Sequence, residues 1–125
     1  MTSPSANQDS YPYQNEPTWS RSGKAVARTA FDAALGRELH EVIQKAKQMA
    51  NEIQQSSDLW DLEHYLTERR KEIDRKYDYR YSQLTHVFGR LLYERRITEE
   101  DLRGLGEDKM KPIRSLAELL AKYAA

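Results

Sequence analysis

The chain of 125 residues has no cysteine, and its 20 Lys and Arg side chains balance its 20 Asp and Glu side chains. Without cysteine there is no disulfide, thiol nucleophile or cysteine–zinc site. A neutral balance argues against a general binder of nucleic acid or anionic membranes, which carries a basic excess. The chain has no apolar run of about 18 residues, so we expect no transmembrane helix. Its N-terminus has no basic region followed by an apolar region, so we expect no secretory signal. These absences predict a small cytoplasmic protein with one domain.

The sequence also lacks the motifs of common enzymes and metalloproteins. It contains no P-loop, no Gly-rich dinucleotide turn, no GxSxG and no HExxH. Of the three histidines, His64 has Asp61 and Glu68 one turn away, a weak metal-binding arrangement. A solvated histidine in a charged helix is the favoured interpretation. We therefore predict no catalysis, no cofactor and no metal site.

The first half of the chain predicts a tail and one long helix. Residues 1–18 are rich in Ser, Pro, Asn and Gln, which is typical of a flexible tail. From about residue 20 to residue 55, apolar side chains recur in steps of four and three, as in a coiled coil. This apolar seam consists of Leu35, Leu39, Val42, Ala46, Met49 and Ile53, and Ile43 widens it.

A second helix is predicted from about residue 58 to residue 95. No proline or glycine lies between Ser57 and Ser82, and Leu59, Leu62 and Leu66 follow helical spacing. A helix of roughly 38 residues spans ~57 Å at ~1.5 Å per residue. A compact domain of about 100 residues has a radius of gyration of only ~13 Å. One copy cannot surround such a rod, so we expect it to lie along a second subunit.

The last third predicts a small helical head. A dense apolar cluster runs from Leu84 to Leu92, and Thr98 with Asp101 resembles a capping box that starts a third helix. The final helix is expected from Met110 or Lys111, because Pro112 fits only in a first turn. The predicted fold is therefore all-α. Two long helices form an antiparallel, coiled-coil-like dimer stem (about residues 20–83), and the head covers about residues 84–125.

The run from Glu68 to Arg80 concentrates charge, with six cations and four anions. One interpretation is a solvated, salt-bridged helix face. The other is that Arg70 pairs with an acid across a dimer beside Trp60, since Trp and Arg are enriched at interface hot spots. A nucleic-acid-binding module is a third possibility, against which the zero net charge weighs.

These residues also carry a family resemblance. Asp58-Leu59-Trp60-x-Leu62, Glu72-Ile73-Asp74-x-Lys76-Tyr77-Asp78-x-Arg80-x-Ser82 and Val87-Phe88 resemble the fluorescence recovery protein family of cyanobacterial photoprotection, over about residues 19–117. The resemblance implies an all-helical homodimer without cofactor. It further implies binding to the photoactivated orange carotenoid protein, mainly through that protein's C-terminal domain. Family members speed its return to the orange form and help detach it from the phycobilisome.

The resemblance also implies roles for individual residues. Its dimer-interface positions are Ile43, Trp60, His64 and Arg70, and its partner-binding positions are Trp60, Arg70, His86, Lys109 and Lys111. Three positions depart from the family pattern: His64 replaces an acid, His86 a phenylalanine and Pro112 a lysine. Similar proteins occur in bacteria without an orange carotenoid protein. The predicted partner is therefore either that protein or an unknown one.

Overall fold

The computed structural model describes residues 18–124, and all regular secondary structure in that range is helical. The elements are α1 (Arg21–Asn51), α2 (Ser56–Lys76), α3 (Leu84–Tyr93), the short 3-10 helix η3 (Glu100–Leu102) and α4 (Glu107–Ala124). The all-α prediction is confirmed. The predicted tail, apart from Thr18, lies outside the described residues.

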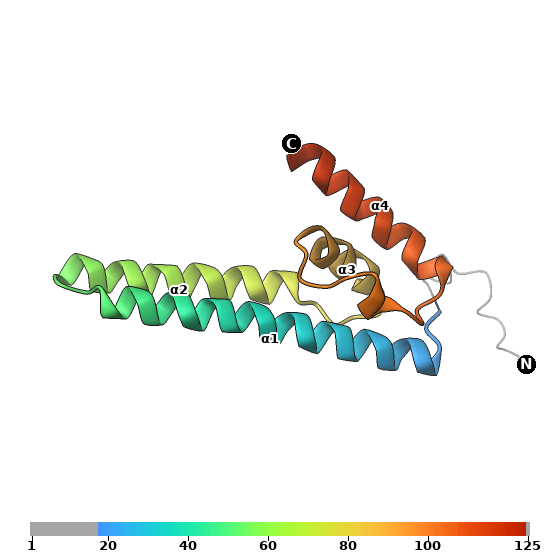
Figure 1. Cartoon of the computed structure of the whole chain (residues 1–125), viewed down its shortest axis with the longest axis horizontal. Helices are drawn as coiled ribbons and strands as arrows, with labels where there is room; N and C mark the ends of the chain where they lie inside the picture. Colours follow the sequence, from blue (N-terminus) through green and yellow to red (C-terminus); the bar gives the residue numbers. More distant parts are fainter. Residues whose placement is uncertain (1–17, 125) are drawn as a thin grey trace, which may run out of the picture.

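Helices α1 and α2 run antiparallel, side by side, and a short turn joins them (Figure 1). The Ser20 hydroxyl caps α1 by accepting the N–H of Gly23 at 3.0 Å. At the start of α2, the Asp58 carboxylate accepts the N–H groups of Gln54 and Gln55 at 3.0 and 3.2 Å. The predicted seam lies only partly inside this hairpin: Val42, Ala46, Met49 and Ile53 are half-buried, whereas Leu39 is 42% exposed.

The predicted single helix from residue 58 to residue 95 is wrong. Helix α2 ends at Lys76, an irregular connector follows, and α3 begins at Leu84. The break occurs because tertiary contacts draw the connector's tyrosines onto α1. Phe31 of α1 makes edge-on ring contacts with Tyr77 and Tyr79, at centroid distances of 5.4 and 4.8 Å. The break also removes the argument that an unbroken rod requires a second subunit.

The core lies at the end of the hairpin far from its turn, where the first half of α1 meets α3, η3 and α4 (Figure 1). Its fully buried large side chains are Phe88, Leu84, Leu91, Leu102 and Ile113. Helices α3 and α4 pack closely because Gly89 has no side chain: an added Cβ would lie 2.7 Å from the Leu116 side chain. Helix α1, part of the predicted stem, shares this core with the helices of the predicted head. The division into a stem (about residues 20–83) and a head (about residues 84–125) therefore stays a prediction.

Two boundaries near the C-terminus differ from expectation. The Thr98–Asp101 capping box is confirmed, with reciprocal hydrogen bonds of 2.9 and 3.2 Å. It starts only the single turn η3. Helix α4 begins at Glu107, so Pro112 lies inside it and not in its first turn. A proline there leaves only the carbonyl of Asp108 without its helical N–H donor, and that residue is exposed to water.

Candidate functional site

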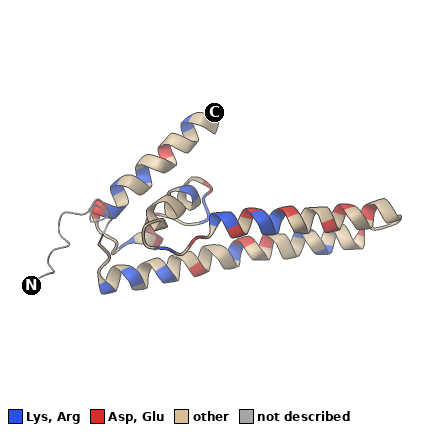
Figure 2. Ribbon diagram, turned by 180° about the vertical axis from the view of Figure 1, so that it is seen from behind, with Lys and Arg blue, Asp and Glu red and all other residues tan. Residues whose placement is uncertain are grey.

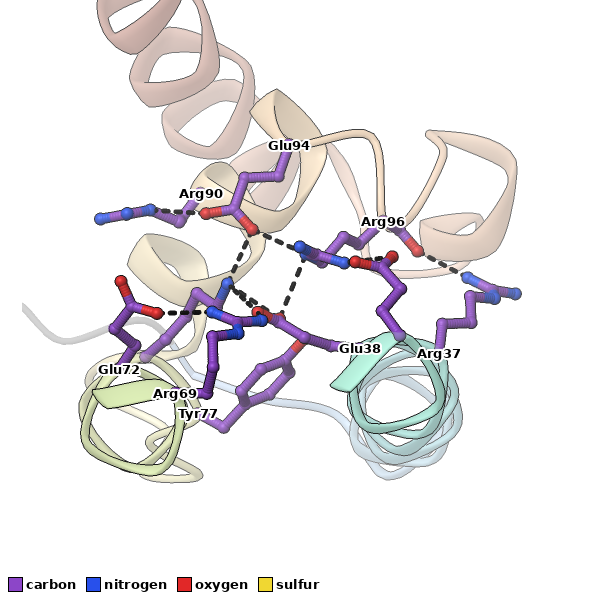
Figure 3. A network of polar contacts seen from close by, with 10 residues as sticks. Arg37, Glu38, Arg69, Glu72, Tyr77, Arg90, Glu94 and Arg96 are labelled. Carbon is purple, nitrogen blue, oxygen red and sulfur yellow. Dashed lines mark hydrogen bonds and ion pairs between the residues drawn. The ribbon is translucent and has the colours of Figure 1, made fainter. Parts of the chain in front are cut away.

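Four charged side chains form a closed ring where α1, the end of α2 and α3 meet (Figure 3). Lys76 donates to Glu38 at 2.8 Å and to Glu94 at 2.7 Å. Arg96 closes the ring, with its Nε 2.8 Å from Glu94 and 3.1 Å from Glu38. Signs alternate around this ion ring (Glu38, Lys76, Glu94 and Arg96), so every member has an opposite charge on both sides. Its side chains are at most 18% exposed.

Further donors surround the ion ring. Glu38, whose side chain is fully buried, also accepts from Arg69 and from the Tyr77 hydroxyl, each at 2.8 Å. Burial opposes ionisation of Glu38, but hydrogen bonds from Lys76, Arg69 and Tyr77 outweigh it and hold its pKa below the usual value. Burial together with the bond to Glu38 raises the pKa of Tyr77. Glu38 is therefore a carboxylate, and Tyr77 a neutral phenol, at physiological pH.

Glu94 stands in the same electrostatic setting at the C-terminal end of α3. Burial disfavours its charge, yet hydrogen bonds from Lys76, Arg90 and Arg96 lower its pKa to about 2. The ion ring thus joins three separate pieces of chain, α1, the end of α2 and the segment after α3, through its charged side chains. A buried ionic network of this kind costs desolvation and adds little net stability, but it fixes geometry. Here it fixes α3 and the loop after it against the hairpin.

Beside the ion ring lies a polar cleft of about 320 Å³, between the last turns of α2 and one face of α3. Its lining residues are Glu38, Arg69, Glu72, Arg75, Lys76, Asp78, Gln83, His86, Val87, Arg90, Glu94 and Arg96. Charged groups of both signs dominate, so the cleft suits a polar or ionic ligand more than an apolar one. His86, predicted as a partner-binding residue, belongs to this lining and is exposed.

The residues predicted for the dimer interface lie on the outside of the hairpin. Ile43 is 50% exposed and Trp60 62% exposed, and the Arg70 side chain is 85% exposed. Ile43 lies eight residues before the end of α1, and His64 lies eight residues after the start of α2. Because the turn joins these two helix ends, both residues lie at a similar level along the hairpin. These residues thus lie accessible on the two helices of the hairpin.

The two predicted lysines of the head have opposite environments. Lys111 is exposed. Lys109 is 2% exposed, donates to the backbone carbonyl of Thr18 and to Asp108, and lies 5.0 Å from the Trp19 ring. The Lys109 ammonium thus has its partners inside the protein, and a contact with another protein stays a prediction. Pro112, on the next turn, is exposed.

Sequence reasoning missed the ion ring. One signal for Glu38 was available: Ala27, Phe31 and Ala34 are buried, and steps of four, three and four place Glu38 on the same stripe of α1. An acid on an apolar stripe needs a buried partner. No such signal exists for Glu94 or Arg96, since their pairing with Lys76 and Glu38 depends on the break after α2.

Within residues 18–124, no three His, Cys, Asp or Glu side chains are grouped so that they could hold a metal ion. In the same range, no helix is both long and apolar enough to span a membrane.

The fold and the site define a class of protein: an all-helical scaffold with a buried ion ring, a polar cleft and a hairpin face that exposes Trp60 and Arg70. Comparison with known proteins gives the family. Residues 19–117 match the family described as photoprotection regulator fluorescence recovery protein, and the chain belongs to that family.

Individual relatives agree. Over 104 residues the chain is 38% identical to the fluorescence recovery protein of Synechocystis sp. (strain ATCC 27184 / PCC 6803 / Kazusa), covering 83% of this chain and 95% of that protein. The solved fluorescence recovery protein of Fremyella diplosiphon superposes with a TM-score of 0.77 at 39% identity, covering 81% of this chain and 99% of that one. The Synechocystis structure matches with the same TM-score and coverage at 38% identity. The family is described as a regulator, and neither its description nor the name of the Synechocystis relative is that of an enzyme.

Proposed function

We propose that this protein is a non-catalytic, dimeric regulator of photoprotection. It binds the photoactivated orange carotenoid protein, accelerates its red-to-orange reversion and promotes its detachment from the phycobilisome. The observation that carries this proposal is family membership over residues 19–117, which include Trp60 and Arg70. A cytoplasmic location stays a prediction.

The proposed mechanism is differential binding. A regulator without a reactive group accelerates a conformational reversion only by binding the compact form, or the transition state toward it, more tightly than the extended form. Large exposed side chains on a rigid element suit this role, because the helix backbone that presents them loses little conformational freedom on binding. Trp60 is 62% exposed on α2, and Arg70 lies ten residues further along the same helix, about 15 Å away.

Support for a homodimer comes from exposed apolar side chains on the two helices of the hairpin. Five large apolar side chains are at least 40% exposed there: Leu39, Ile43, Leu59, Trp60 and Leu66. Such exposure on neighbouring helices is typical of a protein–protein contact. Ile43 and Trp60 belong to this set, and His64 lies one turn beyond Trp60.

Charge along α2 supports an antiparallel pairing of two copies. From Ser56 to Glu68 the helix has four acids and no Lys or Arg, whereas from Arg69 to Lys76 it has five cations and two acids (Figure 2). Two such helices that pair antiparallel bring the acidic half of each opposite the basic half of the other. Complementary potentials of this kind fix register and favour the correct partner.

A second candidate is a helical interaction protein with a different protein partner. It is favoured by the positions where this chain departs from the family pattern. His64 and His86 are exposed, as is Pro112, so all three changes alter the surface offered to a partner and not the core. In this candidate the dimer is the same and the partner is unknown.

One experiment separates the two candidates. The protein is mixed with photoactivated orange carotenoid protein in the dark, and the decay of the red form is timed by absorbance. The proposal predicts acceleration that saturates with protein concentration. A matched sample with the Trp60→Ala variant should show little acceleration. If excess wild-type protein leaves the decay unchanged, the carotenoid-protein assignment is wrong and the second candidate takes its place.

A further inference from the structure

In the cleft beside the ion ring, the acidic side chains are all paired within the described part of the chain, whereas some of the basic side chains are not. Each of its four carboxylates already has a cation. Glu38 and Glu94 belong to the ion ring, Glu72 pairs with Arg69, and Asp78 pairs with Arg80. A cationic ligand would therefore find no free carboxylate in the cleft.

Some basic side chains of the lining still have hydrogen-bond donors without a partner among the residues that the structure describes. Within residues 18–124, neither the Arg75 nor the His86 side chain has a hydrogen-bonding or ion-pair partner, and both residues are exposed. Arg90 uses its Nε to donate to Glu94 at 2.9 Å, which leaves its two terminal nitrogens free. Figure 3 shows these nitrogens pointing away from the ion ring. Three groups that can donate to an anion thus line one cleft.

These three groups stand on two walls. Arg75 comes from the last turns of α2, whereas His86 and Arg90 are one turn apart on the same face of α3. The ion ring holds the two walls together, since Lys76 follows Arg75 and Glu94 follows α3. The backbone segments that carry the donors are therefore positioned before any ligand arrives, which lowers the entropic cost of binding.

We propose that this cleft is a docking site for an acidic segment of a protein partner, with carboxylates seated between Arg75 on one wall and His86 and Arg90 on the other. Arginine clusters recognise acidic motifs through charge-assisted hydrogen bonds. A segment that lies along the cleft reaches both walls, which a single small anion at one side chain does not. The inference rests on the proposed function only in assuming a protein partner.

The test uses a fluorescein-labelled peptide of alternating Asp and Glu, with its Asn and Gln counterpart as control. Binding to the full chain is followed by anisotropy at low ionic strength. Arg75→Glu/His86→Glu removes two free groups and breaks no observed pair. We expect about tenfold weaker binding of the acidic peptide to this variant. Lys47→Glu/Lys122→Glu reverses two exposed cations far from the cleft and should bind nearly as wild type. Circular dichroism verifies that both variants fold. If the Arg75→Glu/His86→Glu variant does not fold, Arg75→Ala/His86→Ala takes its place in the assay.

Three results would overturn the inference. One is unchanged binding to the Arg75/His86 variants, and another is equal loss in both charge-reversed variants, which would indicate only general electrostatics. The third is displacement of the peptide by equimolar inorganic phosphate, which would indicate a small-anion site. Because the peptide assay contains no carotenoid protein, the cleft stands even if that partner is wrong.

Discussion

The Lys76 ammonium lies 2.8 Å from the Glu38 carboxylate, a contact between residues 38 positions apart. It brings a fully buried acid of α1 against the last residue of α2. Since Lys76 also contacts Glu94, this pair links the hairpin to the end of α3 in addition to the hydrophobic core. Removing Glu38 leaves Lys76 with Glu94 alone, and removing Lys76 leaves Glu38 with Arg69 and Arg96.

Replacing Glu38 should destabilise the protein strongly. Glu38→Gln keeps the shape but leaves the ion ring with two buried cations, Lys76 and Arg96, and one acid, Glu94; we expect a loss of about 3–5 kcal/mol in the free energy of unfolding. Glu41→Gln removes a 61%-exposed acid that pairs with the same Arg96 and should cost no more than about 1 kcal/mol. Urea denaturation at one protein concentration measures both. Equal losses would show that burial of Glu38 does not matter.

Glu94 should make stability depend on acid pH. Its pKa is lowered from 4.5 to about 2 in the folded protein, so the folded state favours the carboxylate. The stabilisation is present above about pH 4.5 and is lost as the pH falls toward 2; its size is on the order of 3 kcal/mol. Thermal unfolding between these pH values should show a steep fall in Tm. Glu94→Gln should be less stable at neutral pH and show a shallower acid dependence. An unchanged slope would contradict this assignment.

Two glycine-to-alanine changes should have opposite signs. In Gly89→Ala, the new Cβ would meet Leu116 at 2.7 Å, so α4 must move, and we expect a loss of about 1–3 kcal/mol. Gly36→Ala is the matched control, because nothing lies within 4 Å of its Cβ. Alanine there should stabilise α1 by about 0.5–1 kcal/mol. Calorimetry on the two variants tests the close packing of α3 and α4. A stable Gly89→Ala variant would refute it.

The dimer is tested at Ile43. This side chain is 50% exposed in one copy, so Ile43→Glu should fold normally but place an unpaired charge in the proposed interface. We expect monomers by light scattering. Gln44→Glu adds the same charge on the next exposed residue and should stay dimeric. A dimeric Ile43→Glu variant would mean that the interface lies elsewhere.

Trp60 and Arg70 should matter for binding and not for folding. Trp60→Ala and Arg70→Ala each remove an exposed side chain, so helicity by circular dichroism should be kept. Binding to the orange carotenoid protein should fall by about tenfold or more in each, as for interface hot spots. Lys71→Ala, an exposed neighbour, should bind as wild type. Unchanged affinity for Trp60→Ala or Arg70→Ala would show that the implied family roles do not transfer to this chain.

Much of the fold follows from local sequence. The spacing of Val42, Ala46 and Met49 predicts the hairpin face of α1, and Thr98 with Asp101 predicts a helical turn, because such patterns act within a few residues. The exposed candidates Trp60 and Arg70 were also available from the sequence, through residue type and family pattern. The sequence did not show that these two side chains are exposed and hence accessible to a partner.

The start of α4 shows how a single local rule fails. Pro112 was expected in a first turn, since proline lacks the N–H that helix interiors require. The helix instead begins at Glu107, after Gly106 adopts a positive φ of 94°, and the acids Glu107 and Asp108 favour its N-terminal end. The lost hydrogen bond falls on an exposed carbonyl, where water replaces it at low cost.

The sequence by itself determined that this protein is all-helical, where most helices lie and to which family it belongs, because spacing, caps and motif are local properties of the chain. Only the tertiary structure decided that α2 stops at Lys76, that Lys109 is buried and that Glu38, Glu94 and Arg96 meet. The physical reason is that helix propensity is worth only tenths of a kcal/mol per residue. Edge-on contacts from Phe31 to Tyr77 and Tyr79, and a buried carboxylate that must be paired, outweigh it. The cleft and its unpaired donors exist only because of that break.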